Sequence, residues 1–165
     1  MSSEDFKTRM LAHLHAVLKP EGFRKKQSTF SSERDDSVLF VQLQSSSKTT
    51  KDSLVITVNL GIFSKRVAII VGNIRAPSIL EAHWQDRIGH FMQDGVDKWW
   101  EIHSRDEADL VGREISTILS TDVLPKMKSL APTNSLKSVW ESAVSPGLTD
   151  FERKQYLQAL QKGDS

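Results

Sequence analysis

The sequence contains no cysteine. This absence excludes disulfide bonds, thiolate nucleophiles and zinc or iron–sulfur sites with cysteine ligands, and it favours a reducing compartment, so we expect a cytoplasmic protein. No apolar run approaches the roughly 20 residues that span a bilayer. The N-terminal stretch has the acids Glu4 and Asp5 where an export signal has basic residues, and it has no uninterrupted apolar core. We therefore expect a soluble protein that contacts no membrane.

An excess of charge of either sign is also missing. Lysine and arginine number 22 and aspartate and glutamate 21, so the formal net charge is +1 at pH 7. This balance supplies no general field that would attract nucleic acid or an acidic membrane. A nucleic-acid-binding module is therefore our least favoured interpretation. We see no cofactor motif, and we expect neither a cofactor nor a bound metal.

The chain does have a concentration of β-branched and aromatic residues between Val38 and Val71. The segments VLFVQLQ and LVITVNLGIF are typical of neighbouring strands in an antiparallel sheet. Residues 54–63 alternate, which places Asn59 and Gly61 on the face opposite Leu60. Gly61 indicates a bulge or a close approach of ligand or backbone, and the bulge is the favoured interpretation. The segment 67–71, VAIIV, fits a strand or a short buried helix.

Helical patterns surround this sheet. A polar start at Ser2 or Ser3 precedes an amphipathic helix that ends at Lys19–Pro20. The last third is helical, with Pro125 expected to limit the helix that begins near Ser104. We expect further helices from Thr133, ended by 145–147, and from Thr149. Polar residues 22–34 suit an edge strand, and residues 83–91 another strand. These patterns predict a single α+β domain over 1–165, with an antiparallel sheet of about five strands covered by the N-terminal helix and the C-terminal helices.

Five short motifs occur in a fixed order. They are GFRKK at 22–26, FVQLQ at 40–44, VNLGI at 58–62, HWxxRIG at 83–89 and WW at 99–100. Together they resemble an uncharacterised bacterial family, the domain of unknown function 4304, over about residues 5–130. The resemblance implies no assigned reaction. Some members of that family look like neighbours of polymorphic toxins, which would make them immunity proteins. The helical extension at 132–163 lies outside the resemblance.

The resemblance places the family's recurring polar residues on Gln42, Asn59, His83 and Arg87. If a pocket covers these residues, they would converge on a concave site for a small ligand or a substrate. Their neighbours Asp86 and His90 would join a metal or acid–base site only if 83–91 were a helix. We favour a strand, in which His83 and Arg87 face one way and Asp86 the other, as part of a polar cross-strand face.

The leading hypothesis is a protein-binding domain without catalysis, most specifically a cytoplasmic bacterial immunity protein that occludes a toxin. Adjacent Trp99 and Trp100 would point to opposite faces of an extended segment, so one belongs to the core and the other is a candidate anchor. A run of acids would supply a charge-complementary rim. The expected partner-binding residues are Asp94, Asp97, Trp99, Trp100, Glu101, Asp106, Glu107 and Asp109. The alternative is the small-ligand-binding domain or enzyme with the pocket described above.

Overall fold

One antiparallel sheet organises the computed structural model, which describes residues 1–142 and 148–163. In this part of the chain six strands pair in the order β1-β2-β3-β4-β5, and β6 pairs with β4. The strands are β1 (Arg24–Lys26), β2 (Thr29–Arg34), β3 (Ser37–Ser45), β4 (Leu54–Ser64), β5 (Trp84–Arg87) and β6 (Trp100–Ile102). Strand β4 is the centre of the sheet because β3 runs along one side of it, while β6 and β5 share the other side. The predicted α+β class is confirmed.

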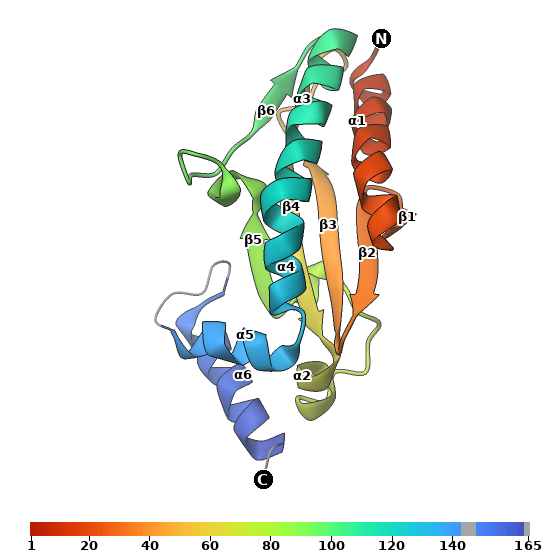
Figure 1. The fold of residues 1–165 in the computed structure, drawn as a ribbon. Helices are drawn as coiled ribbons and strands as arrows, with labels where there is room; N and C mark the ends of the chain where they lie inside the picture. Colours follow the sequence, from red (N-terminus) through yellow and green to blue (C-terminus); the bar gives the residue numbers. More distant parts are fainter. Residues whose placement is uncertain (143–147, 164–165) are drawn as a thin grey trace.

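Three helices, α1 (Ser3–Leu18), α3 (Arg105–Ile118) and α4 (Leu124–Leu130), cover one face of the sheet (Figure 1). The predicted polar start is a capping box: the Ser2 side chain accepts from the backbone of Asp5, and the Asp5 side chain accepts from the backbone of Ser2. Alternate residues of β3 and β4 are buried under these helices. They include Leu39, Val41, Leu43, Ile56, Val58 and Leu60. None of the helices in the described part is long and apolar enough to cross a membrane.

Pro125 does not stop the helical path. Helix α3 continues through a π-helical segment, Leu119–Val123, into α4, where Pro125 lies in the first turn. A π segment widens the helix, and the first turn of the next segment tolerates a residue that has no N–H. The prediction that this proline limits the helix therefore missed the π segment.

The chain after β4 folds back over the sheet face opposite α1, α3 and α4, near the end of β4 (Figure 1). Residues 65–70 form a helix, α2 (Lys65–Ile70), which the Ser64 side chain caps by accepting from Val67 N at 3.1 Å. A 3-10 helix, η2 (Ile79–Glu81), follows. These segments bury a small second cluster of Val38, Phe40, Phe63 and Ala68, with Ile79 packed against it.

Gly61 lies under this returning segment. The register of β3 and β4 runs unbroken through Gly61, so the expected bulge is wrong. A Cβ atom on Gly61 would lie 3.0 Å from both Ala82 Cβ and Ile79 Cγ1. The glycine therefore permits the close approach of a neighbouring segment, which was the second interpretation.

Helices α5 (Thr133–Glu141) and α6 (Asp150–Gly163) close the end of the sheet. Trp140 is 0% exposed, and its Nε1 donates to the carbonyl of His83 at 3.1 Å. The helix predicted from Thr149 is α6, and a capping box of Thr149 and Glu152 begins it. The expected end of α5 at 145–147 lies outside the described residues. The extension thus completes the core of the domain.

Candidate functional site

The sheet face opposite α1, α3 and α4 carries a row of polar side chains from five strands. The register aligns Lys26 with Thr29, Thr29 with Gln42, Gln42 with Asn59, and Asn59 with Arg87. Residues directly opposite each other on neighbouring strands project to the same face, so these five side chains form one line across the sheet. We call these five side chains the polar row. We call the part of this sheet face that α2 and η2 do not cover the open face.

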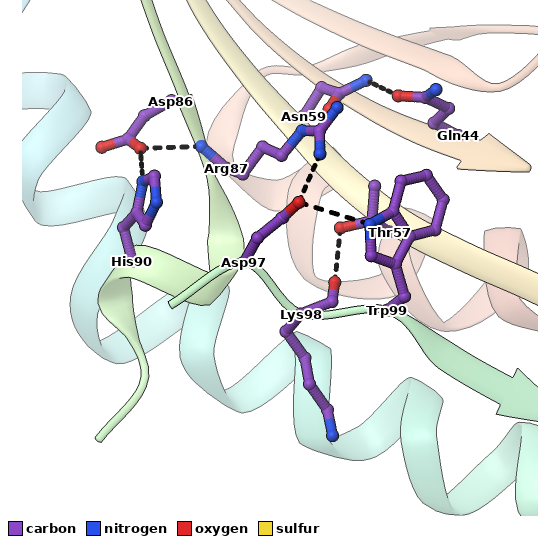
Figure 2. A network of polar contacts seen from close by, with 9 residues as sticks. All are labelled: Gln44, Thr57, Asn59, Asp86, Arg87, His90, Asp97, Lys98 and Trp99. Atoms are coloured by element: carbon purple, nitrogen blue, oxygen red, sulfur yellow. Dashed lines mark hydrogen bonds and ion pairs between the residues drawn. The ribbon is translucent and has the colours of Figure 1, made fainter. Parts of the chain in front are cut away.

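Hydrogen bonds link the amides of the polar row. Gln42 Nε2 donates to Thr29 Oγ1 at 3.2 Å. Asn59 Nδ2 donates to Gln42 Oε1 at 3.2 Å. It also donates to Gln44 Oε1 at 2.6 Å (Figure 2). The two N–H groups of Asn59 are both used, and the chain of amides holds these side chains in fixed orientations.

Arg87 ends the polar row at an ion pair. Its Nη1 lies 2.5 Å from Asp97 Oδ2, and Trp99 Nε1 donates to the same oxygen at 3.3 Å (Figure 2). The Arg87 guanidinium carbon also lies 5.4 Å from the centre of the Trp99 ring, a distance typical of a cation–π contact. Thr57 Oγ1 fixes the same segment by donating to the carbonyl of Lys98 at 2.7 Å. The segment 97–99 is therefore held against the open face.

Gly89 explains why this segment can lie so close. It belongs to the 3-10 helix η3 (Ile88–Phe91) that follows β5. A Cβ atom there would lie 2.2 Å from Val96 O and 2.6 Å from Lys98 N, which no side chain can occupy. The backbone on both sides of Asp97 thus packs directly on Gly89.

A second side-chain pair, Asp86 and His90, lies on the other side of β5. His90 Nδ1 contacts Asp86 Oδ1, and the same carboxylate oxygen accepts from Arg87 N at 2.8 Å (Figure 2). The Asp86 side chain is largely buried, while that of His90 is about half exposed. Asp86 therefore orients His90 and satisfies a backbone donor of β5.

These groups surround a cavity of about 470 Å³. Its lining residues are Gln42, Asn59, Leu60, Ile79, Leu80, Gln85, Asp86, Arg87, His90 and Asp97. Gln42, Asn59 and Arg87, three of the four residues predicted to converge, do meet here. His83 does not line the cavity.

His83 lies farther along the sheet, under α6, and is 3% exposed. Its Nδ1 accepts from Ser64 N at 2.9 Å, and its ring centre lies 4.9 Å from those of both Phe63 and Tyr156. Burial lowers the pKa of His83 to about 4, because the charged imidazolium would lose its hydration. His83 is thus a neutral core residue, and its place in the predicted site is wrong.

A protein-family model matches residues 14–129, and its description is "Domain of unknown function (DUF4304)". The chain belongs to this family. The resemblance seen in the five motifs is therefore confirmed. No curated protein matched the chain. No solved structure matched it either.

The DUF4304 match includes every residue that lines the cavity and leaves out α5 and α6. The candidate site is thus built wholly from the family's own segment. The extension that buries His83 is additional to it.

Within the DUF4304 segment, the predicted acidic rim does not form one free surface. Asp97 pairs with Arg87. Asp109 accepts two hydrogen bonds from Arg9, both at 2.9 Å, and lies 2.8 Å from His13 Nε2. Glu107 accepts from the backbone N of His103 at 2.6 Å near the start of α3. The remaining acids of the prediction, Asp94, Glu101 and Asp106, are exposed.

The two adjacent tryptophans separate as predicted. Trp100 is buried in the main core, so its predicted role in partner binding is wrong. Trp99 is half-buried on the open face. It is therefore the tryptophan available as an anchor.

Some site residues were not predicted. Gln44 follows Gln42 at the two-residue spacing of a strand face, so the alternation of VLFVQLQ could have identified it. Leu80 had no such signal because it comes from the segment that folds back after α2. Residues 83–91 do not form one helix, and the described residues contain no group of three or more His, Asp or Glu side chains that could hold a metal.

Proposed function

We propose that this chain is a non-catalytic protein-binding domain that binds its partner through the open face. The observation that carries this proposal is the placement of Arg87 and Trp99 together on a sheet face that α1, α3 and α4 leave uncovered. Arginine and tryptophan are enriched among the residues that supply most of the binding energy at protein interfaces. Leu80, at the cavity wall, adds an apolar side chain that is 85% exposed.

In its finer form, the proposal is a bacterial immunity protein that neutralises a toxin in the cytoplasm by covering it. The resemblance described above supports this form, since some family members look like neighbours of toxins. Binding by occlusion needs a rigid surface more than it needs a reactive group. The hydrogen-bonded polar row and the anchored segment 97–99 have this property.

The test is affinity capture of the tagged protein from its own cells, followed by mass spectrometry. Leu80→Asp places a charge at the wall of the cavity, and Leu110→Asp is its matched control because Leu110 is 62% exposed on α3, on the opposite side of the sheet. We expect one stoichiometric partner that Leu80→Asp loses and Leu110→Asp keeps. Co-expression with that partner should then relieve any toxicity it has. Capture of no partner, or equal capture by both variants, would contradict the proposal.

A small-ligand-binding domain is the second candidate. The specific observation in its favour is the cavity of about 470 Å³ on which Gln42, Asn59 and Arg87 converge, a size within the usual range for small-molecule sites. It predicts a rise in melting temperature with a low-molecular-weight compound. In a metabolite screen, a rise that Arg87→Gln abolishes would favour this candidate over the first.

A further inference from the structure

Several groups of the open face that remain free for a ligand are hydrogen-bond donors. Asn59 uses both of its N–H groups on the oxygens of Gln42 and Gln44. Within the described residues, this leaves the amide nitrogen of Gln44, one N–H of Gln42 and one N–H of Gln85 without an acceptor. A surface with spare donors is complementary to a ligand that is rich in acceptors.

Arg87 contributes the largest share of these donors. A guanidinium carries five N–H groups in a planar fork. In the described part of the chain, Arg87 has one hydrogen-bond acceptor, Asp97, which contacts Nη1. The Nε and Nη2 edge is therefore free for a second partner, and this edge has the geometry that binds a carboxylate through two parallel hydrogen bonds.

The surroundings of Arg87 hold the guanidinium ready for such a partner. The Trp99 ring lies beside it, and Gly89 allows the backbone of 96–98 to pack closely enough to bring in Asp97. A side chain held in this way loses less conformational entropy when it binds. The Arg87 side chain is nevertheless 38% exposed, so a ligand can reach it.

We propose that Arg87 binds the carboxylate of an aspartate or glutamate side chain that the protein partner inserts into the cavity. This inference rests on the proposed protein-binding function and names the chemistry of the contact. Among anions, a single carboxylate is repelled least, which matters because Asp86 and Asp97 already line the cavity. A phosphate dianion would face stronger repulsion from those two carboxylates. The exposed Leu80 at the wall favours a protein segment over a free anion.

A random dodecapeptide display library tests this inference without knowledge of the partner. We expect selection on the wild-type protein to enrich peptides with an aspartate or glutamate at one position. Fluorescence polarisation should then show about tenfold weaker binding when that acid is replaced by its amide. Arg87→Gln should weaken the acidic peptide by a similar factor and should no longer distinguish the acid from the amide. Arg87→Lys should restore only part of the affinity because an ammonium cannot bind a carboxylate at two points.

Arg113→Gln is the matched control, since it removes the same charge from an exposed position on α3, away from the cavity. We expect this variant to bind the peptide like the wild type. Selection without acidic enrichment, including the failure to enrich any peptide, would overturn the inference, as would equal binding by Arg87→Gln. The protein-binding function would still stand if capture of the partner separated Leu80→Asp from Leu110→Asp. If inorganic phosphate displaced the peptide at lower concentration than acetate does, the site would belong to a phosphorylated ligand, and the inference would be wrong.

Discussion

Arg9 and Arg87 each pair with an aspartate, on opposite sides of the sheet. Arg9 uses Nε and Nη2 to bind both oxygens of Asp109 at 2.9 Å, and His13 contacts the same carboxylate. Arg87 uses one nitrogen to bind one oxygen of Asp97. Hydrogen bonds from Arg9 and then from His13 hold the pKa of Asp109 well below its usual range. The first pair joins α1 to α3, whereas the second lies at a cavity.

The difference separates groups that serve the fold from groups that remain available to a ligand. The carboxylate of Asp109 accepts bonds on both oxygens, so little of its capacity is left for an outside partner. The guanidinium of Arg87 keeps most of its donors, and its only acceptor in the described residues lies in an exposed segment. Of the two arginines, Arg87 is therefore the better candidate for contact with a ligand.

The largest expected effect concerns His83, a buried group whose bonding serves the fold. Its pKa is about 4 in the folded protein and about 6.5 when unfolded, so only the unfolded chain binds a proton between these values. Above pH 6.5, neutral His83 makes its full contribution of about 3 kcal/mol to the free energy of unfolding. This contribution decreases as the pH falls from 6.5 towards 4, and below pH 4 it is lost. Denaturant unfolding at several pH values measures it. His83→Gln should remove this part of the slope, and an unchanged slope would contradict the assignment.

The next effect tests the packing of α1 on α3. Gly112→Ala would place a Cβ atom 2.6 Å from His13 Cδ2 and 3.0 Å from His13 Cβ. The two helices would have to separate, which should lower the free energy of unfolding by about 1–3 kcal/mol. Glu114→Ala is a control at an exposed position of the same helix, and we expect a change within about 0.5 kcal/mol. Equal stability of the two variants would show that α1 and α3 do not pack closely at Gly112, and it would contradict the structural role assigned to this side of the sheet.

The part of the site that could be predicted from the sequence is the part set by strand periodicity. The alternation along residues 54–63 placed Asn59 away from the core, and antiparallel pairing then aligned it with Gln42 and Arg87. A two-residue period and a register are local properties, so sequence patterns carry them.

The remainder depends on contacts between segments that no periodicity connects. Asp97 reaches Arg87 because Gly89 admits the backbone of 96–98, and the sequence shows a glycine there without showing what approaches it. His83 lies outside the cavity, in the core, where Tyr156 and Trp140 of the C-terminal extension contact it. The acids near residue 100 form a run in the sequence. In the structure Glu107 bonds to the backbone near the start of α3, and Asp109 pairs with Arg9 of α1.

Gly89→Ala tests how segment 97–99 is anchored to the open face. The new Cβ atom would collide with the backbone at Val96 and Lys98. Because residues 96–98 are exposed, displacing them from Gly89 uncovers little core, and we expect a loss of only about 1 kcal/mol in stability. The larger result should be a change in the indole N–H signal of Trp99 in the ¹H–¹⁵N NMR spectrum, as its bond to Asp97 is lost. Val96→Ala, in the same segment, should leave this signal in place, and an unmoved signal in Gly89→Ala would refute the anchoring role.

The smallest expected effect on stability is that of Arg87→Gln, which we compare with Arg9→Gln. Arg87→Gln should change the free energy of unfolding by less than about 1 kcal/mol, because an exposed pair with a single contact contributes little to stability. Arg9→Gln should lower stability by more than Arg87→Gln, since it breaks a two-point contact that joins two helices and leaves Asp109 with His13 alone. Urea unfolding of both variants at one pH provides the measurement. If Arg87→Gln were the more destabilising substitution, Arg87 would be a structural residue, and its free donors would no longer argue for a ligand.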